Sequence, residues 1–138
     1  MRKLVLLDTG PLVAYLDRSE QFHAWAVERF RQCTSPLLVC EAVLTEACFL
    51  LAGFLSAREA IRKLLQRGVL VLAPTGHEAQ QEIFLLMTKY AKVPMSYTDA
   101  CLVWLAQRHA GSKVFTLDSD FHIYRLGRAK PIPLIAPT

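Results

Sequence analysis

Short runs of apolar residues alternate along the chain with longer segments in which apolar residues recur every three or four positions. The short runs are typical of strands buried on both faces, and the longer segments are typical of helices. Five strands are predicted, at Lys3–Leu7, Leu37–Cys40, Val69–Ala73, Lys113–Leu117 and Ile132–Ile135. Because helical segments separate them, we predict an α/β fold, a three-layer α/β/α sandwich with a central, mainly parallel sheet.

Residues that start or end helices bound the segments between the strands. The predicted helices cover Leu12–Leu16, about Glu20–Gln32, Glu41–Leu55, Ala57–Arg67, a long segment from Pro74-Thr75-Gly76 to about Lys92, and a segment from Ser96 to Gly111. Apolar residues surround almost the whole of the third helix, so we expect it to be well covered. Ser56 is the expected N-cap of the fourth, with Glu59 completing a capping box.

The 138 residues are 53% hydrophobic and 20% charged, which predicts one folded domain over residues 1–138 and excludes a disordered chain. Met1–Lys3 followed by Leu4–Leu7 resembles the start of a signal peptide, but the apolar run stops at Asp8. Apolar stretches such as Ala47–Ala52 are too short to cross a membrane. We therefore expect a cytoplasmic protein without a membrane partner.

The four cysteines, Cys33, Cys40, Cys48 and Cys101, form no CxxC pair, which argues against structural zinc. Cys48 and Cys101 fall within apolar helical patterns and are expected to be reduced core residues. The net charge of +4 is compatible with a polyanionic partner but does not require one.

Four acidic residues occupy positions that call for an explanation. Asp8 and Asp118 follow predicted strands, Asp99 is near the start of an apolar helix, and Glu46 is the one charge within Ala42–Leu55. Each also has a purely structural interpretation: Asp8 and Asp99 as helix N-caps, Asp118 in an Asx turn, and Glu46 as a partly solvated side chain.

Parallel sheets place ligand sites beyond the carboxyl ends of their strands. Three of the four acids are expected at that edge, and no lysine or arginine lies near Glu46 in the sequence. Carboxylates gathered without cations take up protons or bind a divalent cation. An all-oxygen set of ligands favours Mg²⁺ or Mn²⁺ over zinc.

Four segments that contain these acids resemble, in order and approximate spacing, the acidic motifs of PIN-domain ribonucleases, and most closely those of VapC-type toxins. They are Leu6-Leu7-Asp8-Thr9-Gly10-Pro11-Leu12, Leu44-Thr45-Glu46-Ala47, Ser96-Tyr97-Thr98-Asp99-Ala100 and Phe115-Thr116-Leu117-Asp118-Ser119-Asp120-Phe121. Each motif alone is weak, whereas four in sequence are specific.

The resemblance implies an α/β/α sandwich in which Asp8, Glu46, Asp99 and Asp118 form a pocket for Mg²⁺ or Mn²⁺. It also implies supporting roles for Thr9 and Thr116. Asp120 is an alternative metal ligand in the fourth motif, although we favour Asp118. Gly10 stands where many members have Asn or Ser, so the backbone is expected to substitute there.

The implied activity is metal-dependent hydrolysis of RNA by an endoribonuclease, the toxin of a toxin–antitoxin pair. The alternatives are a non-catalytic RNA-binding or scaffold module and an RNA-processing nuclease that is not a toxin. The resemblance further implies a small antitoxin partner and a homodimer. Tyr97, Arg125, Arg128 and Lys130 are candidate RNA contacts, or else solvated surface residues.

Large apolar residues such as Phe49, Leu50 and Phe54 suggest either a groove for a partner helix or ordinary core packing. Leu6–Gly10 also matches the signature of aspartic proteases, but Pro11 begins a helix where those enzymes need a β-rich fold. A phosphoacceptor receiver would need adjacent acids and a strand-end lysine that the sequence lacks.

Overall fold

A five-stranded sheet forms the centre of the computed structural model, which describes residues 4–138. The strand order is β3-β2-β1-β4-β7, and every neighbouring pair is parallel. The strands are β1 (Val5–Leu7), β2 (Leu37–Val39), β3 (Leu70–Leu72), β4 (Lys113–Phe115) and β7 (Leu134–Ile135). All five lie within predicted strands, although Lys3, in the first of them, is outside the described residues.

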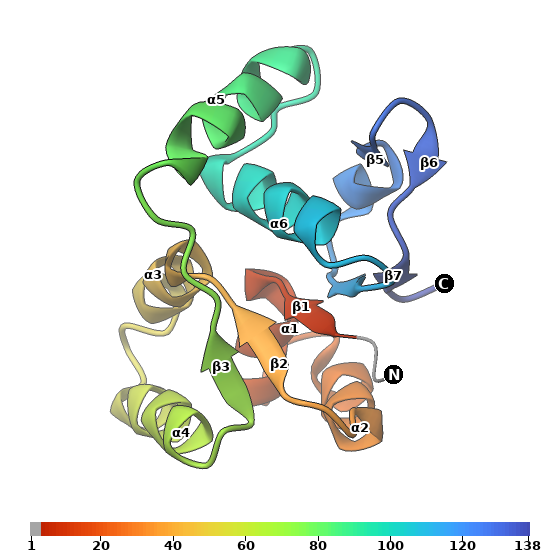
Figure 1. The fold of residues 1–138 in the computed structure, drawn as a ribbon. Coiled ribbons are helices and arrows are strands. Elements are labelled where there is room, and N and C mark those ends of the chain that lie inside the picture. The colour runs from red at the N-terminus through yellow and green to blue at the C-terminus, as the bar shows by residue number, and fades with distance from the viewer. Residues whose placement is uncertain (1–3) are drawn as a thin grey trace.

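Helices cover both faces of this sheet. They are α1 (Thr9–Leu16), α2 (His23–Gln32), α3 (Glu41–Leu50), α4 (Leu55–Gln66), α5 (Ala79–Lys89) and α6 (Tyr97–Arg108). Figure 1 shows α5 and α6 on one side of the sheet and α1, α2 and α4 on the other. The predicted α/β/α sandwich with a parallel sheet is therefore confirmed.

The most enclosed helix is α6, in which every residue from Thr98 to Ala106 is buried. It contacts β1, β4, α3 and α5, so the sheet and two helices surround it. On the opposite face of the sheet, the rings of Trp25 and Phe30 from α2 pack against Phe115 of β4, with centroids 5.5 and 5.3 Å away. These contacts fix the carboxyl ends of β1 and β4 between two well-packed layers.

The segment after β4 contains structure that the sequence pattern did not predict. Residues Ser119–His122 form a 3₁₀ helix, whereas the sequence predicted only an Asx turn at Asp118. Strands β5 (Arg125–Leu126) and β6 (Lys130–Pro131) then form a small antiparallel hairpin, with Gly127 in the left-handed region at φ 63°. Two-residue strands leave too short a pattern for period-two alternation to be recognised.

The prediction of a well-covered helix over Glu41–Leu55 is wrong. The helix ends at Leu50, and its last turn is exposed, with Phe49 80% accessible to solvent. Cys48 on the same turn is also exposed, against its predicted core position. Helix α3 has apolar residues on both faces. One face packs on the core, and the other is exposed to solvent, so apolar residues all round a helix did not mean that it is covered on all sides.

The predicted capping box at the start of α4 is also wrong. The N-cap is Phe54, without a side-chain hydrogen bond, and Ser56 lies inside the helix. Glu59 instead pairs with Arg62, one turn further on. The helix predicted up to about Lys92 is shorter, since α5 covers Ala79–Lys89 only.

Within residues 4–138, no helix is both long and apolar enough to span a membrane.

Candidate metal centre

The strand order reverses between β1 and β4, because β2 and β3 extend the sheet from one side of β1 and β4 and β7 extend it from the other. A crevice forms at such a switch point, beyond the carboxyl ends of the two strands. Asp8 follows β1 directly, and Asp118 follows β4 by three positions. The topology therefore brings both acids to the crevice.

Asp8 is the N-cap of α1 and is buried. Its Oδ1 accepts a 2.7 Å hydrogen bond from the amide of Thr9, and its Oδ2 accepts one of 2.7 Å from the Thr116 hydroxyl. The same hydroxyl oxygen accepts a 2.9 Å hydrogen bond from the amide of Asp118. The N-cap interpretation is thus correct, and Thr116 also links the first acid to the fourth.

Glu46 projects from the middle of α3 and is held by two hydroxyls. Thr9 Oγ1 donates to its Oε1 and Thr98 Oγ1 donates to its Oε2, both at 2.8 Å. One donor begins α1 and the other lies in the first turn of α6. The Glu46 side chain is half-buried, as the partly solvated interpretation predicted, and its carboxylate is also fixed between two helices.

Asp99 lies in the first turn of α6 but is not its N-cap. That position is Ser96, whose hydroxyl accepts a 3.0 Å hydrogen bond from the Asp99 amide. The Asp99 carboxylate accepts a 2.9 Å hydrogen bond at Oδ2 from the hydroxyl of Tyr124, which is fully buried. The N-cap interpretation of Asp99 is wrong, and its carboxylate points towards the other acids.

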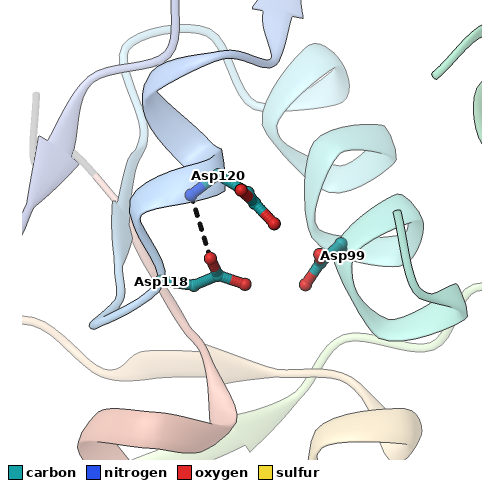
Figure 2. A group of neighbouring side chains, drawn as sticks. All are labelled: Asp99, Asp118 and Asp120. Atoms are coloured by element: carbon teal, nitrogen blue, oxygen red, sulfur yellow. Dashed lines mark hydrogen bonds between the residues drawn. The ribbon is translucent and has the colours of Figure 1, made fainter. Parts of the chain in front are cut away.

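Asp118 and Asp120 lie side by side at the start of the 3₁₀ helix. Asp118 Oδ1 accepts a 2.9 Å hydrogen bond from the Asp120 amide, which is the predicted Asx-type turn. Figure 2 shows both side chains and that of Asp99 directed into one space. Their nearest carboxylate oxygens lie within 4.8 Å of one another, close enough to share one cation.

All four predicted acids line one pocket of about 440 Å³. Its walls are Asp8, Thr9, Gly10, Glu46, Leu50, Pro94, Ser96, Asp99, Leu117 and Asp118. Asp120 belongs to the carboxylate cluster but not to these walls. The sequence therefore identified the residues that gather here, although Thr98 and Tyr124, which hold two of the acids, were not singled out.

The surroundings make ionisation of Asp8 and Asp99 costly. Burial raises the pKa of Asp8 from its usual 3.8 to about 6, and repulsion from Asp99 and Asp118 adds to the effect although hydrogen bonds from Thr116 and Thr9 oppose it. Burial likewise raises the pKa of Asp99, against the hydrogen bond from Tyr124. A bound cation would remove this cost.

The donor set fits a hard divalent cation. Every ligand atom in the cluster is a carboxylate oxygen, and the hydrogen bonds that orient them come from hydroxyl and amide groups. In the described part of the chain, no lysine or arginine forms an ion pair with any of these acids. Oxygen ligands without thiol or imidazole match Mg²⁺ or Mn²⁺ better than zinc.

The candidate RNA contacts lie outside the pocket walls. Arg128 and Lys130 are exposed on the hairpin, while the Arg125 guanidinium donates to the carbonyls of His122 and Tyr124. The Tyr97 hydroxyl donates to Gln80 at 2.6 Å. None of these side chains takes part in the carboxylate cluster, and Tyr97 lines a separate pocket together with Gln80.

Gly10 has a steric reason to be glycine. A Cβ at this position would lie 3.2 Å from Cβ of Leu117, tighter than ordinary contact. The missing side chain lets the first turn of α1 approach the segment between Thr116 and Asp118. The pocket wall at Gly10 is consequently backbone.

The parallel sheet, with carboxylates gathered at its switch point, defines an α/β protein with a candidate divalent-metal centre. The sequence profile of the PIN domain matches residues 5–126. The chain belongs to the PIN-domain family and is of the VapC type.

One relative, the ribonuclease VapC26 of Mycobacterium tuberculosis, is 30% identical over 116 residues, which cover 83% of this chain and 86% of the relative. The crystal structure of VapC20 from the same organism, described as a toxin that cleaves the sarcin-ricin loop, has the same fold. It matches with a TM-score of 0.75 at 16% identity, over 94% of this chain and 99% of that one.

Proposed function

We propose that this chain is a metal-dependent endoribonuclease, the toxin of a toxin–antitoxin pair, that acts as a single domain in the cytoplasm. The observation that carries the proposal is the convergence of Asp8, Glu46, Asp99 and Asp118 on one pocket at the sheet's switch point. Family membership and the relatives named as ribonuclease and toxin support the reaction and the biological class.

Asp8, Glu46 and Asp99 would hold the metal, and Asp118 with Asp120 would hold a second ion or position the attacking water. Bound Mg²⁺ or Mn²⁺ supplies Lewis-acid charge for the phosphodiester oxygens and activates water. The chain itself contributes orientation, since Thr9, Thr98, Thr116 and Tyr124 fix the carboxylates by hydrogen bonds. Burial of Asp8 keeps that part of the pocket away from bulk solvent.

Substitution of two acids tests this proposal. Asp8→Asn and Asp99→Asn keep side-chain shape but remove ligand charge, so cleavage of RNA in Mg²⁺ or Mn²⁺ should fall by about a thousandfold or more. Glu78→Gln, an exposed acid at the start of α5, serves as the control and should retain full activity. Full cleavage by both pocket variants would refute the nuclease assignment, and no cleavage by the wild type would favour a binding module.

The hairpin after the 3₁₀ helix is the proposed RNA contact. Arg128 and Lys130 are exposed there, and Lys89 donates to the hairpin carbonyl of Gly127, adding a third positive charge. Tyr97 is 37% exposed and offers a ring on which an unpaired base can stack. This positive edge would offset the repulsion between the acidic pocket and the phosphate backbone.

A small antitoxin is the proposed protein partner, with a contact surface formed by Phe49, Leu50, Phe54 and Leu55. These residues end α3 and begin α4, and all four are exposed. Leu50 also lines the acid pocket, so the apolar surface continues into the candidate metal centre. A partner segment with apolar residues followed by a basic one would cover this surface and neutralise the acids.

We further propose a homodimer that uses α5. Phe84 and Leu85 are 56% and 67% exposed, and the Phe84 ring lies 5.9 Å from that of Tyr97. Two large apolar side chains beside an aromatic ring are more than a solvated helix face needs. Sedimentation should give twice the monomer mass for the wild type and the monomer mass for Phe84→Glu/Leu85→Glu.

Expression in bacteria separates a toxin from an RNA-processing enzyme. The wild type alone should slow growth, and Asp99→Asn should not. Normal growth together with RNA cleavage by the purified protein would assign the chain to processing instead.

A further inference from the structure

Two cysteine side chains that are far apart in the sequence meet between β2 and α6. Cys40 follows β2 and is the N-cap of α3, while Cys101 lies in the second turn of α6. Each is only 1% exposed. Both thiols line one pocket and lie close enough to interact with each other. The fold thus places two free, buried thiols on the wall of the same pocket.

These thiols share the wall of a pocket of about 390 Å³, which is distinct from the acid pocket. Its other walls are Glu41, Ala42, Thr75, Gly76, His77, Gln80 and Tyr97. The remaining cysteines lie elsewhere: Cys33 lines a pocket with Leu4 and Lys113 at the amino ends of the strands, and Cys48 is exposed on α3. A space of this volume admits a small reagent to two side chains that are otherwise covered.

We propose that Cys40 and Cys101 form a redox-active dithiol site, which closes to an intramolecular disulfide when a peroxide enters the pocket. Both S–H bonds break and one S–S bond forms, so the pair gives up two electrons and two protons. The O–O bond of hydrogen peroxide breaks and takes up these electrons and protons, leaving two water molecules. Low-molecular-weight thiols would reverse the reaction by exchange.

The bridge would join two elements that carry candidate metal ligands. Cys40 begins the helix that bears Glu46, and Cys101 is two positions from Asp99 on α6. The chain between the cysteines would become a closed loop, which reduces the conformational freedom of the unfolded state. The oxidised protein should therefore unfold at a higher temperature than the reduced protein.

A variant that keeps only this pair provides the test. In Cys33→Ser/Cys48→Ser, treatment with hydrogen peroxide should lower the mass of the monomer by about 2 Da, remove both alkylatable thiols and raise the melting temperature. Dithiothreitol should restore all three. The matched Cys40→Ser/Cys101→Ser variant should keep both of its thiols under the same mild treatment.

Three results would overturn the proposal: retention of both free thiols in Cys33→Ser/Cys48→Ser, addition of oxygen to sulfur without loss of 2 Da, or a disulfide-linked dimer. If that variant does not fold, oxidised wild-type protein is digested and its cross-links are mapped by mass spectrometry. A link between residues 40 and 101 is expected. Links that involve only Cys33 or Cys48, or no link, contradict the proposal.

Discussion

The hydroxyl of Tyr124 donates a 2.9 Å hydrogen bond to Oδ2 of Asp99, and Tyr124 is fully buried. Its ring packs edge-on against Tyr90 and Phe121, with centroids 5.1 Å from each. The phenol therefore has a fixed direction, and it constrains one carboxylate of the candidate metal centre. It acts on the metal only through Asp99, so Tyr124 is a positioning residue.

Tyr124→Phe should weaken Mn²⁺ binding by about tenfold, because groups that orient metal ligands commonly contribute that much. It should also raise the pH midpoint of Mn²⁺ binding, since the lost hydrogen bond favours the charged form of Asp99. Isothermal titration at several pH values measures both. The control is Tyr15→Phe, which removes the same hydroxyl from a tyrosine whose ring stacks on Phe30 of α2. Lower thermal stability with unchanged Mn²⁺ binding would make Tyr124 purely structural.

Asp8→Asn should stabilise the metal-free protein above pH 6. The folded pKa of Asp8 is about 6 and its usual value is 3.8, so folding favours the protonated form. This contribution is fully present below about pH 3.8 and is lost as pH rises through about 6. At pH 8 the free energy of unfolding of Asp8→Asn should be larger than that of the wild type by about 1–3 kcal/mol.

Urea unfolding in EDTA at pH 4 and pH 8 measures this difference. The difference in free energy of unfolding between Asp8→Asn and the wild type should be small at pH 4 and large at pH 8. With Mn²⁺ in place of EDTA at pH 8, the wild type should become the more stable of the two. An equal gap at both pH values would show that burial of the Asp8 charge does not limit stability.

Asp118→Asn should weaken Mn²⁺ binding more than Asp120→Asn. Asp118 lines the pocket with Asp8 and Glu46, and its amide is tied to Thr116, whereas Asp120 lies in the cluster but outside the pocket walls. Titration of both variants with Mn²⁺ under the same conditions shows which of the two acids is the nearer metal ligand. A larger loss for Asp120→Asn would assign that residue as the nearer ligand.

Thr98→Val should reduce RNA cleavage by about tenfold with little change in stability, because it removes one of the two hydroxyls that orient Glu46. Thr45→Val is the matched control, since the Thr45 hydroxyl donates only to the Glu41 carbonyl within α3. Equal activity of both variants would mean that Thr9 alone suffices to hold Glu46.

Arg128→Gln/Lys130→Gln should raise the KM for RNA several-fold and leave kcat nearly unchanged. Loss of phosphate contacts should also make the dependence of log KM on log salt concentration shallower. Arg58→Gln/Lys63→Gln on exposed positions of α4 removes the same charge and should leave KM unchanged. An equal rise in KM for both double variants would show that the net charge of the protein, rather than phosphate contacts of the hairpin, determines RNA binding.

The sequence was sufficient to predict the sheet and the gathering of the acids. Val5–Leu7 and Val114–Phe115 are short buried runs, and an acid after each such run can be placed at the sheet's carboxyl edge by topology alone. The gathering of Asp8, Glu46, Asp99 and Asp118 followed from family motifs rather than from periodicity.

What the sequence could not predict depends on tertiary packing. The sequence left open whether Phe49 packs in the core or faces a partner, because apolarity alone does not say which face of a helix is covered. Ser56 and Glu59 have capping-box spacing, yet the helix begins at Leu55 and Arg62 attracts Glu59. Thr98 and Tyr124 carried no signal, because their partners lie 52 and 25 positions away.

The enclosure of α6 has a consequence for how activity is switched off. Asp99 lies on a helix in which every residue from Thr98 to Ala106 is buried, so the amide protons of this segment should exchange only slowly with water. Fraying at helix ends should therefore leave Asp99 in its place in the proposed catalytic centre. Occupation of the pocket by a partner, rather than local unfolding of α6, is therefore the expected way to inhibit the proposed activity.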